Sequence, residues 1–134
     1  MKKDPVSSSD LYPWGFSMLD KWLQIRNKNL GLESYFHDNN MQTVAIYGIG
    51  VLGRRLIEQL KLDGITISYG IDKRKSEINI DGIQVYAPWD ELPAVDVVVV
   101  TPIYFYEIEE LLQGKFGAWQ NIVSIEDIIN YCIE

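Results

Sequence analysis

The sequence predicts an α/β fold with three layers, in which helices cover both faces of a five-stranded parallel sheet with the strand order 3-2-1-4-5. After residue 40, short apolar runs alternate with helical stretches, which is the pattern of a β-α-β chain. One of these runs is four consecutive valines, Val97–Val100, and such a run is typical of a strand buried on both faces of a parallel sheet. Right-handed crossovers favour the proposed strand order.

Residues 1–40 precede the first strand and are predicted to form a helical extension, while residues 41–134 form the α/β domain. A helix is expected over about residues 17–30, because large apolar side chains recur there at spacings of three and four. Asn29 and Gly31 then favour its end, and a second short helix is expected around Leu32, Tyr35 and Phe36.

Five strands and the helices between them follow along the chain. The pattern predicts strands at residues 43–47, 65–71, 83–86, 95–101 and 121–124, with the third strand at a sheet edge. Helices are expected at 54–62 and from 104 to about 113, and Pro88 favours a brief helical turn through residue 92. Ser124 is expected to cap a last helix, with Asp127 three residues later as in a capping box.

The composition restricts the partners and the compartment. The 134 residues carry a net charge of −7, which disfavours nucleic acid and anionic membranes as partners. No run approaches the roughly 18 apolar residues of a membrane span. The single cysteine, Cys132, cannot form a disulfide within the chain or a thiolate metal site, so we expect a reduced, cytoplasmic protein without a metal centre.

A glycine-rich run follows the first predicted strand. Its residues are Gly48, Ile49, Gly50, Val51, Leu52 and Gly53, which form a G-x-G-x-x-G motif. In this pattern the first glycine permits a sharp turn, the second lets a pyrophosphate approach the backbone, and the third allows close packing of helix on sheet. Because the motif lies between a strand and a helix, it predicts a Rossmann-like site with phosphates at the helix N-terminus.

An acidic residue ends the second predicted strand. Asp72 lies 19 residues after Gly53, where a carboxylate accepts hydrogen bonds from ribose hydroxyls, and this favours NAD over NADP as the cofactor. The adjacent Lys73 and Arg74 weaken this preference, because basic side chains there suit a 2′-phosphate. The alternative is that Asp72 is only a turn residue at the strand end.

The end of the fourth strand is expected to contribute to the same site. Thr101 and Pro102 lie at the switch point of the predicted sheet, where Thr101 is a candidate donor to phosphate or ribose. Tyr104 is a candidate for stacking on a ligand ring, although it is also an ordinary aromatic at a helix start. His37 and Cys132 are interpreted as a surface residue and a small apolar residue.

Four stretches of the sequence resemble a Rossmann-like module of bacterial polysaccharide biosynthesis. They are residues 44–53 (VAIYGIGVLG), 69–72 (YGID), 81–86 (DGIQVY) and 88–92 (PWDEL), within a similarity that covers about residues 43–131. The module is similar to the N-terminal domain of nucleotide-sugar N-acetyltransferases and to the cofactor domain of sugar-nucleotide dehydratases. It also resembles small standalone proteins found alongside glycosyltransferases. The resemblance implies a nucleotide or sugar-nucleotide ligand, whereas the catalytic parts of those enzymes have no counterpart here.

The sequence is compatible with three functions. The first is a nucleotide- or dinucleotide-binding module in sugar-nucleotide metabolism without a complete catalytic apparatus. The second is an NAD-dependent oxidoreductase or epimerase component that needs a second chain, and the third is a degenerate scaffold for protein–protein contact. The aromatic residues of the first 40 positions suit either a cover packed on the sheet or an interface with a second copy or a glycosyltransferase.

Overall fold

A parallel sheet of five strands forms the centre of the fold. The computed structural model describes residues 8–134, and its strands follow the order β3-β2-β1-β4-β5 with every pairing parallel. The strands are β1 (Val44–Tyr47), β2 (Ile67–Ile71), β3 (Val85–Tyr86), β4 (Val97–Val100) and β5 (Asn121–Ser124). The predicted α/β class and strand order are therefore confirmed. Every residue of β1 and β4 is buried, because helices cover both faces of the sheet at these strands.

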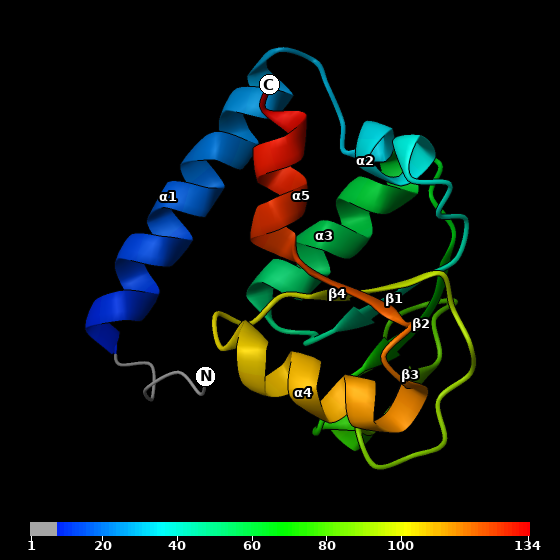
Figure 1. Ribbon diagram of the computed structural model, residues 1–134. Coiled ribbons are helices and arrows are strands. Elements are labelled where there is room, and N and C mark those ends of the chain that lie inside the picture. The colour runs from blue at the N-terminus through cyan, green and yellow to red at the C-terminus, as the bar shows by residue number, and fades with distance from the viewer. Residues whose placement is uncertain (1–7) are drawn as a thin grey trace.

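The helices divide unequally between the two faces. They are α1 (Ser8–Asn27), α2 (Glu33–Asp38), α3 (Val51–Leu62), α4 (Phe105–Phe116) and α5 (Ile125–Cys132), with a short 3₁₀ turn, η1 (Lys75–Glu77), after β2. Figure 1 shows α1, α2, α3 and α5 on one side of the sheet and α4 on the other. The chain forms three layers, which is the Rossmann-like arrangement expected from the sequence.

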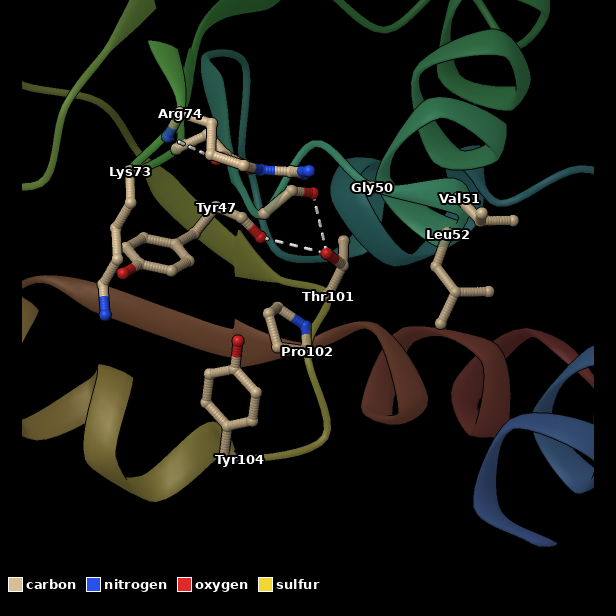
Figure 2. Close-up of a pocket in the computed structure, with 11 residues that line it drawn as sticks. Tyr47, Gly50, Val51, Leu52, Lys73, Arg74, Thr101, Pro102 and Tyr104 are labelled. Carbon is tan, nitrogen blue, oxygen red and sulfur yellow. Dashed lines mark hydrogen bonds and ion pairs between the residues drawn. The ribbon is translucent and has the colours of Figure 1, made fainter. Parts of the chain in front are cut away.

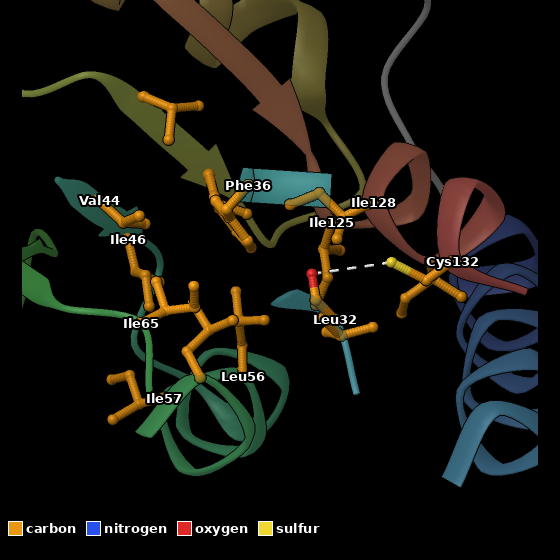
Figure 3. Packing of buried hydrophobic residues seen from close by; sticks show 14 of the residues in the cluster. Leu32, Phe36, Val44, Ile46, Leu56, Ile57, Ile65, Ile125, Ile128 and Cys132 are labelled. Atoms are coloured by element: carbon orange, nitrogen blue, oxygen red, sulfur yellow. Dashed lines mark hydrogen bonds between the residues drawn. The ribbon is translucent and has the colours of Figure 1, made fainter. Parts of the chain in front are cut away.

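Each face of the sheet has its own apolar cluster. The larger cluster joins the helices of the crowded side to alternate residues of β1 and β4, and Figure 3 shows Phe36, Leu56 and Ile125 meeting there. The smaller cluster lies under α4, where Ile108 and Leu112 pack on the remaining strand residues. Alternation along the strands distributes these side chains, because successive residues point to opposite faces.

The N-terminal helices are part of the larger core. Met18, Trp22 and Ile25 of α1 are buried in the same cluster as α3 and α5. The Trp22 indole N–H donates to Gln59 Oε1 of α3 at 3.3 Å, and Lys21 Nζ donates to Asn130 Oδ1 of α5 at 3.0 Å. This side of α1 therefore has the packed face that its apolar spacing predicts.

Several element boundaries differ from those predicted. Helix α1 begins at Ser8 rather than near residue 17. Pro13 and Gly15 in its early turns are poor helix formers, so the apolar spacing from Met18 onward marked only its later part. The expected helical turn after Pro88 is a hydrogen-bonded turn in which the Asp90 N–H donates to the Ala87 carbonyl at 3.0 Å. Asn29 ends the first helix as expected, with a positive φ of 59°. None of the helices within residues 8–134 has both the length and the apolar character for crossing a bilayer.

Candidate functional site

Two of the three motif glycines are required by the fold itself. Gly48 has a φ of +93°, and a Cβ atom there would lie 2.6 Å from Thr101 Oγ1 and 2.8 Å from Pro102 Cδ. A Cβ atom on Gly53 would lie only 2.0 Å from the Gly48 carbonyl oxygen. All three distances are too short for a side chain, so these glycines allow the sharp turn out of β1 and the close approach of α3 to that turn.

Gly50 differs from these two glycines because the protein leaves open space beside it. It is the N-cap of α3 with φ −95° and ψ −151°, and a Cβ atom there would meet nothing within 4 Å. No side chain caps this helix end. Because the first N–H groups of an α-helix have no acceptor within the helix, they remain available to an acceptor in the open space.

The open space is a cavity of about 450 Å³ at the carboxyl ends of β1, β2 and β4. This volume lies within the range of ~300–1,000 Å³ that is usual for small-molecule sites. The predicted site residues other than Ile49 and Gly53 line the cavity, together with Tyr104, the candidate for stacking, and Tyr47 (Figure 2). The lining consists of Tyr47, Gly48, Gly50, Val51, Leu52, Asp72, Lys73, Arg74, Thr101, Pro102 and Tyr104.

Ile49 contributes to the site through its backbone rather than its side chain. The side chain is buried in the larger core and lies against Gly70 of β2. Its N–H group donates to Asp72 Oδ2 at 2.8 Å, which fixes the glycine turn to the end of β2. The position after Gly48 is thus structural, and the sequence motif gave no sign of this contact.

Asp72 lies where the fingerprint predicts it, but its carboxylate already has partners. Oδ2 accepts the Ile49 N–H, while Oδ1 accepts the Arg74 N–H at 2.8 Å in a turn two residues long. The Arg74 Nε atom lies 3.5 Å from Oδ1. Since an ionised carboxylate offers about four lone-pair positions, acceptor capacity remains for a ribose hydroxyl. Both interpretations of Asp72 therefore fit the geometry.

Thr101 lies at the predicted position, but its hydroxyl faces the backbone. Its Oγ1 atom lies 2.8 Å from the Gly48 carbonyl oxygen and 3.1 Å from that of Tyr47, and donates its single proton within this pair (Figure 2). This hydrogen bond joins the end of β4 to the glycine turn, and the Thr101 side chain is buried there. It shapes the cavity wall and has no second proton for a phosphate.

Tyr47 was missed as a cavity residue. It ends β1, and a strand buried on both faces shows no alternation that would mark one side chain as facing a ligand. Burial raises the pKa of the Tyr47 phenol, with smaller contributions from Tyr104 and the Asp72 carboxylate. At neutral pH the phenol is therefore a neutral hydrogen-bond donor or acceptor. Tyr104 also lines the cavity and is half exposed.

The charge around the cavity differs from that of the whole chain. Lys73 and Arg74 are exposed at its mouth, and Figure 2 shows the Arg74 side chain extending from the end of β2 towards the start of α3. The positive end of the α3 dipole adds to these two cations. An anionic group is therefore favoured here even though the chain carries a net charge of −7.

The other residues considered from the sequence do not form a second reactive centre in the described part of the chain. His37 is exposed on α2. Cys132 is buried, its Sγ lies 3.6 Å from Ser34 Oγ, and burial raises the pKa of its thiol. Within residues 8–134, no group of three or more His, Cys, Asp or Glu side chains is placed to hold a metal ion.

The fold and the cavity define a Rossmann-like α/β domain with an opening at the switch point between β1 and β4. Ligands of open α/β sheets bind at this place, outside the carboxyl ends of the strands. Comparisons of the chain with models of protein families, with curated proteins and with solved structures found no match.

Proposed function

We propose that this protein binds a nucleotide, with the ligand phosphates at the N-terminus of α3. The observation that carries the proposal is Gly50, the one motif glycine whose missing side chain serves no contact within the protein. A glycine without a role in the fold is explained when a ligand occupies the space beside it. The unpaired helix N–H groups and the Arg74 guanidinium supply the partners that a phosphate requires.

The ribose then lies beside Asp72, with NAD or another nucleotide that has a free 2′-hydroxyl as the expected ligand. The remaining lone pairs of the Asp72 carboxylate accept ribose hydroxyls and repel a 2′-phosphate. Arg74 is the side chain that would reverse this preference, because a guanidinium binds phosphate by two hydrogen bonds. A direct titration of NAD against NADP therefore tests which of the two residues sets the specificity.

A second hollow supports a sugar nucleotide as the ligand class. It has a volume of about 200 Å³ and lies on the other side of the segment that follows β4. Trp14, Ser124, Glu126 and Asp127 are among its lining residues. Aromatic rings and carboxylates suit a neutral group rich in hydroxyls, such as a sugar, better than a second phosphate. A ligand with a nucleotide part and a sugar part would use both hollows along one edge of the sheet.

The biological setting that we propose is sugar-nucleotide or surface-polysaccharide metabolism in the cytoplasm. It rests on the resemblance of residues 43–131 to modules of that pathway and on the free, buried Cys132. The proposed role is binding, because the cavity holds no nucleophile paired with a base among the described residues. An oxidoreductase or epimerase component that obtains its catalytic groups from a second chain is the alternative.

The test is a binding screen with NAD, NADP, UDP-sugars, CoA and AMP, followed by thermal shift and calorimetry. A ligand at 100 times its dissociation constant should stabilise the fold by about 2.7 kcal/mol. Gly50→Val should abolish binding while the fold is retained, because the new side chain enters the cavity. Gly114→Val is the matched control, since Gly114 also has open space around it but lies in α4, outside the cavity lining.

The possible results separate the proposals. Binding by the wild-type chain and by Gly114→Val, but not by folded Gly50→Val, supports the site. Equal affinity of folded Gly50→Val refutes it. A chain that binds none of these ligands favours a scaffold for protein contact, and conversion of a ligand when a second chain is added favours the enzyme component.

A further inference from the structure

A second apolar face of α1 remains uncovered in the single chain. Met18, Trp22 and Ile25 face the core, but a different set of large side chains follows the helix at spacings of four, three and four residues. This set, which we call the outer stripe, consists of Tyr12, Phe16, Leu19 and Leu23, with exposed fractions of 74%, 79%, 44% and 60%. Figure 1 shows α1 as the outermost helix of the crowded face. Soluble monomers rarely expose a continuous apolar surface of this kind.

A groove lies beside the outer stripe. It lies between α1 and α3 and has a volume of about 280 Å³. Its walls include Leu19, Leu23 and Arg26 of α1 and Arg55, Glu58 and Leu62 of α3. Leu62 on the α3 wall is 77% exposed, so the groove is apolar on both sides. Arg55 and Glu58 pair with each other at 2.7 Å, which leaves little net charge on the α3 wall. A large apolar side chain would bury these surfaces.

The chain carries both the projecting side chain and the groove that fits it, but a single copy cannot join them. Phe16 is the most exposed of these side chains. The Arg26 end of the groove lies ten residues further along α1, which corresponds to about 15 Å at 1.5 Å per residue. Phe16 therefore cannot reach that end of its own groove. The Phe16 side chain of a second copy can, and the reverse contact forms at the same time under two-fold symmetry.

We propose that the outer stripe of α1 and the α1–α3 groove form the interface of a homodimer in which the two α1 helices pack antiparallel. Leu19 of each copy lies opposite Leu23 of the other, and Phe16 lies opposite Arg26. This register follows from the charge on the face: Arg26 is the charged residue that continues the outer-stripe spacing. Antiparallel packing places its guanidinium over an aromatic ring, which is an attractive contact. Parallel packing in register would place two Arg26 side chains against each other.

The first experiment measures the mass of the whole protein in solution by sedimentation equilibrium. The wild-type chain is expected to be a dimer. Phe16→Glu and Leu23→Glu are each expected to raise the dimer dissociation constant at least ~30-fold, the effect of a central interface residue. Both residues are exposed, so circular dichroism should show a native fold. Leu111→Glu is the matched control, because Leu111 is a leucine of similar exposure on α4 and lies on the opposite face.

The second experiment determines the orientation of the helices. A Leu19→Cys chain is mixed with a Leu23→Cys chain and oxidised, and the linked species are identified by mass. Antiparallel packing links the two different variants, since their Cα atoms approach to within disulfide range. Parallel packing links each variant to itself. The wild-type chain, whose Cys132 is buried, reports any background reaction.

Each result bears directly on the proposal. A dimer that Phe16→Glu and Leu23→Glu separate, with crosslinks between unlike variants, supports it. A wild-type chain that remains monomeric up to ~1 mM overturns it, because such an association is too weak to matter. A dimer that both variants leave intact overturns the interface, and crosslinks between like variants overturn the antiparallel register.

Discussion

The contrast between Gly53 and Gly50 gives the sharpest test of the site geometry. In Gly53→Ala, the new Cβ atom would lie 2.0 Å from the Gly48 carbonyl oxygen, so that oxygen must move by about 1 Å to reach even the shortest observed contacts. The same oxygen accepts the Thr101 hydroxyl at 2.8 Å, and the movement weakens this bond. Overpacking costs ~1–3 kcal/mol and the hydrogen bond ~1 kcal/mol, while alanine returns ~1 kcal/mol of helix propensity.

Gly53→Ala should therefore lower the free energy of unfolding by about 1–3 kcal/mol, or the melting temperature by about 4–12 °C. Gly50→Ala should change it by less than about 1 kcal/mol, because its Cβ meets no atom and the weaker N-cap is offset by a less flexible unfolded chain. Urea unfolding followed by circular dichroism measures both. A Gly53→Ala protein as stable as the wild type, or a Gly50→Ala protein equally destabilised, would refute the division into structural and ligand-facing glycines.

Three further predictions concern single polar side chains. Thr101→Val should cost ~1–2 kcal/mol in urea unfolding, because the Gly48 carbonyl loses its hydroxyl donor; an unchanged midpoint would contradict this. Asp72→Ala should cost ~1–3 kcal/mol even without ligand, since the buried Ile49 N–H loses its acceptor; a loss of binding without a loss of stability would assign Asp72 to the ligand alone. Burial raises the pKa of Tyr69 from 10.0 to about 12, so its phenol contributes stability that is complete below pH 10 and lost as pH rises towards 12. The loss is at most about 3 kcal/mol, and Tyr69→Phe should remove this part of the pH dependence of unfolding.

The positions of β1, β2 and β4 could be predicted because each has a strong local signal. The four valines of β4 and the β-branched residues of β1 and β2 identify buried strands, and the crossover rule then orders them. The third strand has the weakest local signal, and it contains only Val85 and Tyr86. No regular helix supports it: the chain between β2 and β3 contains only η1 and an isolated bridge between Ile80 and Ile83.

The location of the cavity could be predicted from the sequence, but the hydrogen-bond partners of its polar side chains could not. The glycine motif placed the helix start, and the strand ends placed Asp72 and Thr101 beside it. Which partner a hydroxyl or carboxylate bonds to depends on contacts between distant segments, such as Gly48 and Thr101, which lie 53 positions apart. The start of α1 was missed because the prediction used only the apolar side chains from Met18 onward: Tyr12 and Phe16 begin the outer-stripe spacing but are exposed, and Pro13 lies inside the helix.

The packing of α1 against α5 has a consequence for how the chain is made. Lys21 bonds to a residue 109 positions later, so α1 leaves the ribosome long before its helical neighbour exists. At ~5–20 residues per second, this interval lasts roughly 5–20 s. During that time the cluster that buries Met18, Trp22 and Ile25 lacks its α5 residues, while Phe16 and Leu23 on the other side of the helix are exposed. Until α5 is made, α1 thus presents an incompletely covered core face as well as its exposed outer stripe, so a chaperone that binds apolar segments of the nascent chain has two faces of this helix to recognise.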